Sequence, residues 1–350
     1  MKSAKLKVKS FSEVTIAVLG SHSALDVCRG AKDLGFKTLV VCQKGREKTY
    51  QKYYKNIVDE VLILDKFSDI LKPEVQKKLL EKNAIFIPHR SFEVYINDYN
   101  AIEKKFKVPM FGNRFLLKIE ERGVKPNQYD LLDRAGIRYP KQFKDPKKID
   151  RLCIVKVLEK ERGFERAFFF AENYKEYELG VTQGVGPAVI EEFIVGVQVN
   201  FNFFYSVVHD RLELLGTDTR RQTNIEGLTK LPSIYEEQLL KKIGIKYEEA
   251  GHVAVTVLES LLEDAFEMGE KFVKVSGVIG PFALQTVITP GPPKKEIIVF
   301  DVSPRMPGSP GIFATPYSGY LYSENLSMGK RVAMEIKEAI EKGKLNKILT

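Results

Sequence analysis

Tryptophan is absent from the 350-residue sequence, and cysteine occurs only at Cys28, Cys42 and Cys153. An odd number of cysteines without metal-binding spacing argues against a zinc site, so these thiols are expected to be small buried hydrophobes. No run of about 18 apolar residues occurs, and the lysine-rich stretch Met1–Ser10 is not followed by the apolar core of a signal peptide. We therefore expect a cytoplasmic protein with no membrane partner.

Charge is abundant but dispersed. The sequence has 55 Lys and Arg against 46 Asp and Glu, a formal net charge of +9, and 44% hydrophobic residues. The basic residues form no arginine-rich block or recognition motif, which argues against nucleic acid as a partner. A site for anionic small molecules explains the charge equally well. Length and hydrophobic content allow two or three domains with substantial cores.

The start of the chain has the pattern of a βαβ unit. Thr15–Leu19 and Thr38–Cys42 are short β-type runs, and the residues between them recur at helical spacing after the turn Gly20–Ala24. Such a turn puts free backbone N–H groups at the carboxyl edge of a parallel sheet, where anions bind. N-capping is the alternative interpretation of Ser21 and Ser23. His22 is a stronger ligand-binding candidate because it lies at that edge.

More short strands complete a doubly wound, Rossmann-like domain that extends to about residue 123. They are expected at Val61–Leu64, Ile85–Ile87 and Val108–Met110. The loop Pro88–Phe92 follows one of these strands and reaches the same sheet edge as His22, which brings Ser91 near it. Loop decoration is the alternative interpretation of these polar side chains.

The second half of the chain has the pattern of an antiparallel-rich domain. Ile154–Val157 is a strand with one lysine, Lys156, which is a usual means of bringing a cation to nucleotide phosphates; a structural lysine is an equal alternative. Glu159–Arg166 is predicted to be the charged tip of a hairpin. Val253–Phe272 and Ser327–Ile340 have helical spacing, and the latter should pack against this second domain.

Two β-type runs flank a Pro/Gly-rich turn near residues 290–295 and form a predicted hairpin with a polar centre. By the two-residue period of a strand, Gln285 shares a face with Ala283 and Val287, and Asp301 shares one with Ile297 and Val299. Gln285 and Asp301 should then lie diagonal to each other within roughly 7–8 Å. One Mg²⁺ could bridge their oxygen atoms. An amide and a carboxylate facing solvent are the alternative.

Longer strings carry a family resemblance that extends over almost the whole chain. Asp301–Arg305 (DVSPR) resembles the signature that closes the metal site of ATP-grasp ligases, in which the Arg is available to a phosphate or carboxylate oxygen. The other matching strings are Leu19–His22 (LGSH), Gly30–Phe36 (GAKDLGF), Phe67–Ile70 (FSDI), Pro88–Phe92 (PHRSF), Val108–Arg114 (VPMFGNR), Ile190–Phe193 (IEEF), Asn224–Leu228 (NIEGL), Glu259–Leu262 (ESLL), Gly280–Gln285 (GPFALQ) and Ser327–Ile336 (SMGKRVAMEI). Together they resemble the archaeal PurP family of formaminoimidazole-carboxamide ribotide synthetases.

The resemblance implies an α/β protein with an α+β second half: a Rossmann-like, ribotide-binding domain over residues 1–123 and an ATP-grasp domain over 124–350. It implies a ligase of purine biosynthesis that uses ATP, Mg²⁺ or Mn²⁺, formate and aminoimidazole-carboxamide ribotide, and that forms a homo-oligomer. Carried over by position, the ribotide-binding residues are His22, Ser91 and His252, where the family usually has Asn at the third position. The nucleotide-binding residues are Lys156, Glu191, Glu192, Phe193, Ile194 and Gln222. The metal ligands are Gln285 and Asp301, and Arg305 is the catalytic candidate.

The sequence departs from the family most at the loop after the Ile-Val-Lys strand. The family has a glycine-rich phosphate-covering loop there, whereas this chain has Leu158–Phe168, with one glycine and the acids Glu159, Glu161 and Glu165. A backbone without glycine approaches phosphate oxygens less closely, and the carboxylates would repel ATP. A non-catalytic or altered-substrate relative that binds nucleotide or ribotide, or regulates the active enzyme, is therefore the alternative function.

Overall fold

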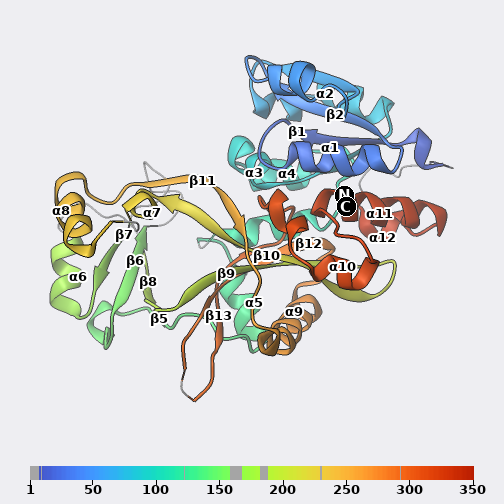
Figure 1. Ribbon diagram of the computed structural model, residues 1–350. Coiled ribbons are helices and arrows are strands. Elements are labelled where there is room, and N and C mark those ends of the chain that lie inside the picture. Colours follow the sequence, from blue (N-terminus) through green and yellow to red (C-terminus); the bar gives the residue numbers. More distant parts are fainter. Residues whose placement is uncertain are drawn as a thin grey trace.

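Strands of the described residues form three β-sheets, which divide the molecule into three parts (Figure 1). The computed structural model describes residues 8, 10–121, 123–157, 168–181, 188–228, 231–291 and 293–350. The predicted loop at 158–167 lies outside these residues. No helix in the described ranges is long and apolar enough to cross a membrane. Cys28, Cys42 and Cys153 are buried free thiols, as expected.

The first sheet is parallel, with strand order β3-β2-β1-β4. Its strands are β1 (Thr15–Leu19), β2 (Lys37–Gln43), β3 (Glu60–Leu64) and β4 (Ala84–Ile87), and its helices are α1 (Ala24–Asp33), α2 (Pro73–Glu81), α3 (Arg90–Ile96) and α4 (Tyr99–Lys104). β1 and β4 are buried throughout, as expected of a sheet covered on both faces. The order reverses at β1, so the crevice beyond β1 and β4 is the ligand-binding edge of such a sheet. Only Met110 of the strand expected at Val108–Met110 pairs, through a bridge to Phe86.

The two other sheets are antiparallel, which confirms the expected character of the second half. The small sheet has the order β5-β8-β6-β7 and the large one β11-β10-β9-β12-β13. The small-sheet elements are α5 (Gln128–Arg134), β5 (Gln142–Phe143), β6 (Cys153–Val157), β7 (Phe168–Ala171), α6 (Tyr174–Val181) and β8 (Ala188–Glu192). The large-sheet elements are β9 (Val197–Ser206), β10 (Arg211–Thr223), α7 (Ile225–Leu228), α8 (Ser233–Ile243), β11 (Tyr247–Ala254), α9 (Leu262–Ser276), β12 (Gly280–Ile288) and β13 (Ile297–Ser303). The chain ends with α10 (Tyr317–Tyr322), α11 (Met328–Glu341) and α12 (Leu345–Ile348).

One expected helix begins later than predicted. Residues up to Ala254 belong to β11, and α9 begins only at Leu262. Among the described strands, β11 is at the edge of the sheet and pairs with β10. Its sequence runs into the helical spacing of the residues that follow, so the sequence pattern did not show where the strand ends.

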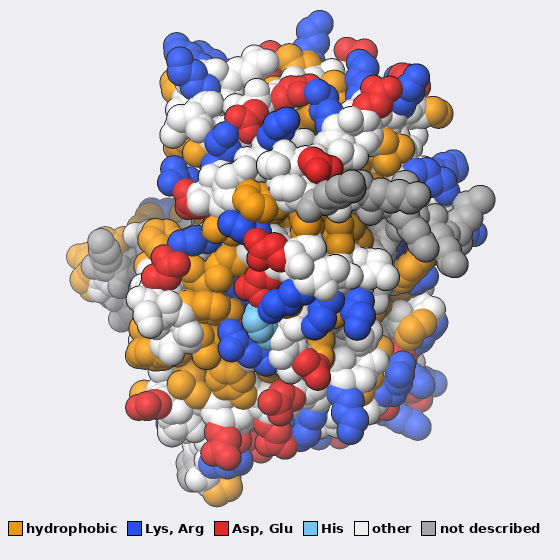
Figure 2. All heavy atoms as spheres, turned by 90° about the vertical axis from the view of Figure 1, so that its right-hand side faces the viewer, with side chains coloured by type: hydrophobic (Ala, Val, Ile, Leu, Met, Phe, Trp, Pro, Cys, Tyr) orange, Lys and Arg blue, Asp and Glu red, His pale blue; other side chains and the backbone are white. Residues whose placement is uncertain are grey.

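The C-terminal helix α11 packs mainly against α1 of the first domain, so the expectation that it packs against the second domain was incomplete. Two glycines allow the close approach: a Cβ at Gly30 would collide with the backbone at Gly329 and Lys330, and a Cβ at Gly329 would collide with the backbone of Asp26. Figure 1 shows α11 between α1 and the large sheet. Acidic and basic side chains are both spread over the face that carries α11 (Figure 2).

Candidate active site

A row of polar side chains crosses four strands of the large sheet. Asp218 on β10 is aligned with Asn200 on β9, Asn200 with Gln285 on β12, and Gln285 with Asp301 on β13. The neighbours one residue along, which include Phe201 and Leu284, point to the opposite face and belong to the hydrophobic core. The sheet therefore has one face built for packing and one face built for polar chemistry.

Gln285 and Asp301 lie on a common face, as predicted, but they are directly opposite rather than diagonal. The Nε2–H of Gln285 donates to Asp301 Oδ2 at 3.0 Å and to Ser303 Oγ at 3.3 Å. The expectation that Asp301 shares a face with Val299 was wrong. The pairing skips one residue of β13 between them, a β-bulge, which leaves Val299 buried in the core while Asp301 faces the polar side.

The oxygen atoms at this end of the row are of the kind that a hard cation takes as ligands. Asp301 supplies a carboxylate, Gln285 an amide oxygen once its amide turns, and Ser303 a hydroxyl, all oxygen ligands of the kind Mg²⁺ takes. No group of three or more His, Cys, Asp and Glu in the described part of the chain could hold a metal ion. Asp301, Gln285 and Ser303 could supply only part of the coordination of such a cation, and phosphates and water would have to supply the rest.

The other end of the row is organised by Asp218, a residue that the sequence did not single out. Its carboxylate accepts hydrogen bonds from Asn200 at 3.0 Å, Asn202 at 2.6 Å and His252 Nδ1 at 2.5 Å. Burial alone would raise the pKa of Asp218, but the hydrogen bonds from His252 and the two amides outweigh it and hold this pKa below its ordinary value. Ser309 Oγ also lies 3.0 Å from His252 Nδ1. His252 is thus fixed on the polar face.

His22 and Ser91 converge at the carboxyl edge of the parallel sheet. Ser91 Oγ donates to Ser21 Oγ at 3.1 Å, and the ring of His22 stacks on that of His89 with centroids 5.2 Å apart. His22 has a left-handed φ of 50°, which is uncommon for a residue other than glycine. Because a carbonyl only accepts, the contact of 3.0 Å between His89 Nε2 and Leu19 O places a proton on that nitrogen. Burial lowers the pKa of His89 to about 4.

Arg305 lies in a buried ionic cluster beside this edge. Its Nη2 is 3.0 Å from Glu120 Oε1, and its Nε is 3.5 Å from Glu93 Oε1. Arg90 Nη1 contacts the same Glu120 at 2.9 Å. Burial and the nearby Glu120 raise the pKa of Glu93 to about 8, against the opposing pull of the two arginines. The cluster ties the segment after β13 to α3, the helix that carries Ser91.

The small sheet holds the predicted nucleotide residues. Lys156 Nζ pairs with the fully buried Glu191 at 2.6 Å, and the hydroxyl of Tyr129 donates to the same carboxylate. Glu192 pairs with Arg151 at 3.2 Å. Phe193 is 38% exposed and packs edge-on against Phe170. This leaves an exposed apolar surface where β8 leads into the large sheet.

The remaining predicted nucleotide residues are partly buried or known only by position. Ile194 follows Phe193 and is intermediate in burial. Gln222 lies in β10 at an irregularity of its pairing with β11, between Arg221 and Thr223.

Comparison with known proteins assigns the chain to a family. The 5-formaminoimidazole-4-carboxamide-1-(beta)-D-ribofuranosyl 5'-monophosphate synthetase of Methanothermobacter thermautotrophicus is 40% identical, with 97% of this chain and 96% of the relative covered. The protein of the same name from Methanopyrus kandleri is 39% identical, with 97% and 95% covered. The chain belongs to this synthetase family. The family profiles described as "Protein of unknown function (DUF1246)" and "Domain of unknown function (DUF1297)" match residues 16–143 and 171–350.

Solved structures agree with membership of this synthetase family. The IMP biosynthesis protein PurP from Thermococcus kodakaraensis is 29% identical and has a TM-score of 0.70, with 96% of this chain and 100% of that chain covered. N5-carboxyaminoimidazole synthetase from Staphylococcus aureus, at 12% identity, shares the fold with a TM-score of 0.62 and covers 95% of this chain and 78% of its own. The predicted ATP-grasp fold and the predicted family are confirmed. The family makes the protein an ATP-dependent ligase, and nothing in the comparisons supports the alternative of a non-catalytic relative.

The structure brings most of the predicted synthetase residues into two groups. His22, Ser91, His252, Arg305, Gln285 and Asp301 lie around the polar face and the edge of the parallel sheet, linked by the segment that follows β13. Lys156, Glu191 and Glu192 lie on the small sheet, and Phe193 and Ile194 follow directly after β8. Asp218 and Asn200 were missed as candidate site residues, whereas His89 belongs to the loop Pro88–Phe92 that the sequence placed at this edge. The alternation of Asn with Phe in β9 was the available signal for the polar face.

Proposed function

We propose that the protein is an ATP- and formate-dependent ligase of purine biosynthesis that converts aminoimidazole-carboxamide ribotide to the formamido ribotide. The γ-phosphate of ATP passes to formate to give formyl phosphate. The exocyclic amine of the ribotide then attacks the formyl carbon, the carbon–oxygen bond to phosphate breaks, and ADP and phosphate leave. The observation that carries the proposal is the polar row on β10, β9, β12 and β13, which extends from Asp301, a proposed cation ligand, to Asp218, the partner of His252.

The proposed roles follow from position and chemistry. Asp301 and Gln285 would hold Mg²⁺ or Mn²⁺, which would neutralise charge on the transferring phosphoryl group. His22, Ser91 and His252 would bind the ribotide. The guanidinium of Arg305, which is held in its ionic cluster, would interact with the reacting phosphate or carboxylate oxygens.

The nucleotide residues have a structural role as well. Glu191 forms an ion pair with the ammonium group of Lys156, and ATP would compete with that carboxylate for the ammonium group. Glu192, Phe193, Ile194 and Gln222 would line the rest of the nucleotide site.

We also propose that the protein acts in the cytoplasm, as a homo-oligomer, without nucleic acid or membrane partners. Helix α8 supports the oligomer, because it has exposed apolar side chains at Ile234, Tyr235 and Ile243. Sedimentation velocity would test this, and a single species of about 39.8 kDa at micromolar concentration would contradict it.

The decisive experiment is a phosphate-release assay with all four combinations of formate and ribotide. A ligase releases phosphate from ATP only when both substrates are present, at an ordinary rate of about 1 s⁻¹ or more. Such coupled release would also show that the glycine-poor loop holds the nucleotide by other means. If the protein binds the ribotide but never releases phosphate, the altered-substrate alternative replaces the proposal.

A further inference from the structure

Ser23 is a buried serine whose hydroxyl does not do what its position suggests. It is the N-cap residue of α1, yet its side chain makes no capping hydrogen bond. The hydroxyl instead lies between two other groups: Oγ is 2.6 Å from Pro307 O and 2.7 Å from His22 Nδ1. Ser23 is 2% exposed and its contact with Pro307 O is buried, whereas its contact with His22 is only partly buried. The capping interpretation of this serine therefore fails, and its hydroxyl connects His22 to the segment after β13.

The direction of these two hydrogen bonds follows from counting protons. Pro307 O is a carbonyl oxygen and can only accept, so the single proton of the Ser23 hydroxyl points to it. Ser23 Oγ must then accept from His22, which places a proton on His22 Nδ1. In a neutral imidazole the other nitrogen, Nε2, consequently carries a lone pair and no proton.

The surroundings favour the neutral form of His22. Desolvation of the imidazole lowers the pKa of His22, and its neighbours His89, Arg305, His252 and Arg220 lower this pKa further. His89 stacks on the ring, and its own proton is committed to Leu19 O, so His89 cannot exchange protons along this stack.

A glycine leaves room at the acceptor nitrogen. A Cβ at Gly308 would lie 2.6 Å from His22 Nε2, closer than any real contact. The absence of a side chain at Gly308 thus keeps the acceptor side of the ring uncrowded.

We propose that Ser23 is a positioning residue that holds His22 in the Nδ1–H tautomer, so that Nε2 accepts a hydrogen bond from an N–H or O–H group of the nucleoside part of the ribotide. This inference rests on the proposed function. Phosphate oxygens are themselves acceptors, and a lone pair on Nε2 would repel them. In this proposal, the ribotide phosphate therefore lies away from His22 Nε2.

Nitrogen NMR of the protein labelled with ¹⁵N-histidine tests the tautomer directly, without ligand. The chain has four histidines, so each imidazole can be assigned by single substitution. We expect His22 in the Nδ1–H form and His89 in the Nε2–H form. Ser23→Ala should move His22 towards a mixture of tautomers and leave His89 unchanged. A wild-type His22 with its proton on Nε2, or with two protons at pH 7, overturns the proposal.

Ligand affinity tests the consequence. Ser23→Ala should weaken binding of the aminoimidazole-carboxamide ribotide and of its phosphate-free riboside by the same factor, about 5- to 10-fold. Ser318→Ala is the matched control, because Ser318 is also fully buried and its hydroxyl bonds only to backbone groups of Leu326. Weaker ribotide binding with unchanged riboside binding would place His22 on the phosphate and refute the inference.

The two measurements separate the inference from the function on which it rests. The expected His22 tautomer in a protein that binds neither probe would refute the proposed function and leave the role of Ser23 intact. Ribotide binding by a protein whose His22 is protonated on Nε2 would refute the role of Ser23 and leave the proposed function intact.

Discussion

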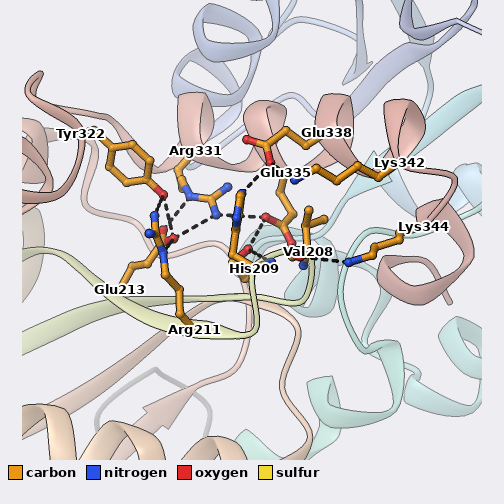
Figure 3. A network of polar contacts seen from close by, with 11 residues as sticks. Val208, His209, Arg211, Glu213, Tyr322, Arg331, Glu335, Glu338, Lys342 and Lys344 are labelled. Carbon is orange, nitrogen blue, oxygen red and sulfur yellow. Dashed lines mark hydrogen bonds and ion pairs between the residues drawn. The ribbon is translucent and has the colours of Figure 1, made fainter.

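The ionic network between α11 and the β9–β10 hairpin offers a quantitative test of what holds α11 against the large sheet (Figure 3). Arg331 on α11 is 1% exposed and pairs with Glu213 at 2.6 Å and with Glu335 at 3.0 Å. Its guanidinium also lies 4.2 Å from the ring centroid of Phe204. The perturbation is Arg331→Met, which keeps most of the side-chain volume and removes the charge.

The two carboxylates would be affected unequally. Glu213 keeps Arg211 at 2.8 Å and the hydroxyl of Tyr322 at 2.7 Å. Glu335 keeps only neutral donors, the hydroxyl of Ser206 at 2.8 Å and the backbone N–H of Val208 at 2.9 Å. Breaking one buried pair costs about 3–5 kcal/mol because it leaves an uncompensated charge. Most of this cost therefore falls on Glu335, and adding Glu335→Gln to Arg331→Met should restore about half of the loss.

Urea unfolding followed by circular dichroism measures these effects, since the chain has no tryptophan to report by fluorescence. Lys342→Ala is the control: Lys342 pairs with Glu338 at 3.3 Å with 46% of its side chain exposed, and such a pair contributes about 0–1 kcal/mol. The double variant should be more stable than Arg331→Met alone. A single variant that loses no more than the control, or a double variant that is less stable than the single one, would refute the reasoning.

Three further predictions concern packing, pH and the metal site. Gly329→Ala should destabilise the protein by about 1–3 kcal/mol, because its Cβ collides with the backbone of α1, whereas Gly227→Ala, with open space around it, should not. His89 has a pKa of about 4 in the folded state against 6.5 unfolded, so below pH 6.5 only the unfolded chain takes up this proton. Stability should fall by up to about 3 kcal/mol from pH 6.5 to pH 4, and His89→Gln should lack that component in pH-dependent unfolding. Asp301→Asn should reduce Mg²⁺-dependent phosphate release by about 100-fold or more with an unchanged circular dichroism spectrum, while Asp264→Asn, on α9 with 42% of its side chain exposed, should leave that release unchanged.

Sequence patterns predicted elements well wherever one period dominates. The strands of the parallel sheet and the hairpin of β12 and β13 were found because their apolar runs are short and bounded by turn residues. Helix α8 was missed because none of its residues is buried, so no apolar stripe faces a core. The bulge between Asp301 and Val299 was also invisible, since an inserted residue changes the phase of a strand without changing its composition.

Candidate site residues were predictable where a single residue stands out by its own chemistry. They were not predictable where the role of a residue depends on its partners in the fold. Gln285, Asp301 and His22 stand out as polar residues in apolar or turn contexts. Asp218 did not, because its role depends on Asn200, Asn202 and His252, which come from two other strands. Ser23 has the residue type and the position of an ordinary N-cap. Only the contact of its hydroxyl with Pro307 O shows that it binds a different partner.

The segment from Arg305 to Ser309 explains why the two halves of the site must form together. Arg305 reaches the carboxylates beside α3, Pro307 O accepts from Ser23, and Ser309 contacts His252. This short segment after β13 thus contacts residues near both the parallel and the antiparallel sheet, at the groups proposed to bind the ribotide. A shift of β13 would therefore reach His22 through the contact of Pro307 O with Ser23, and His252 through Ser309.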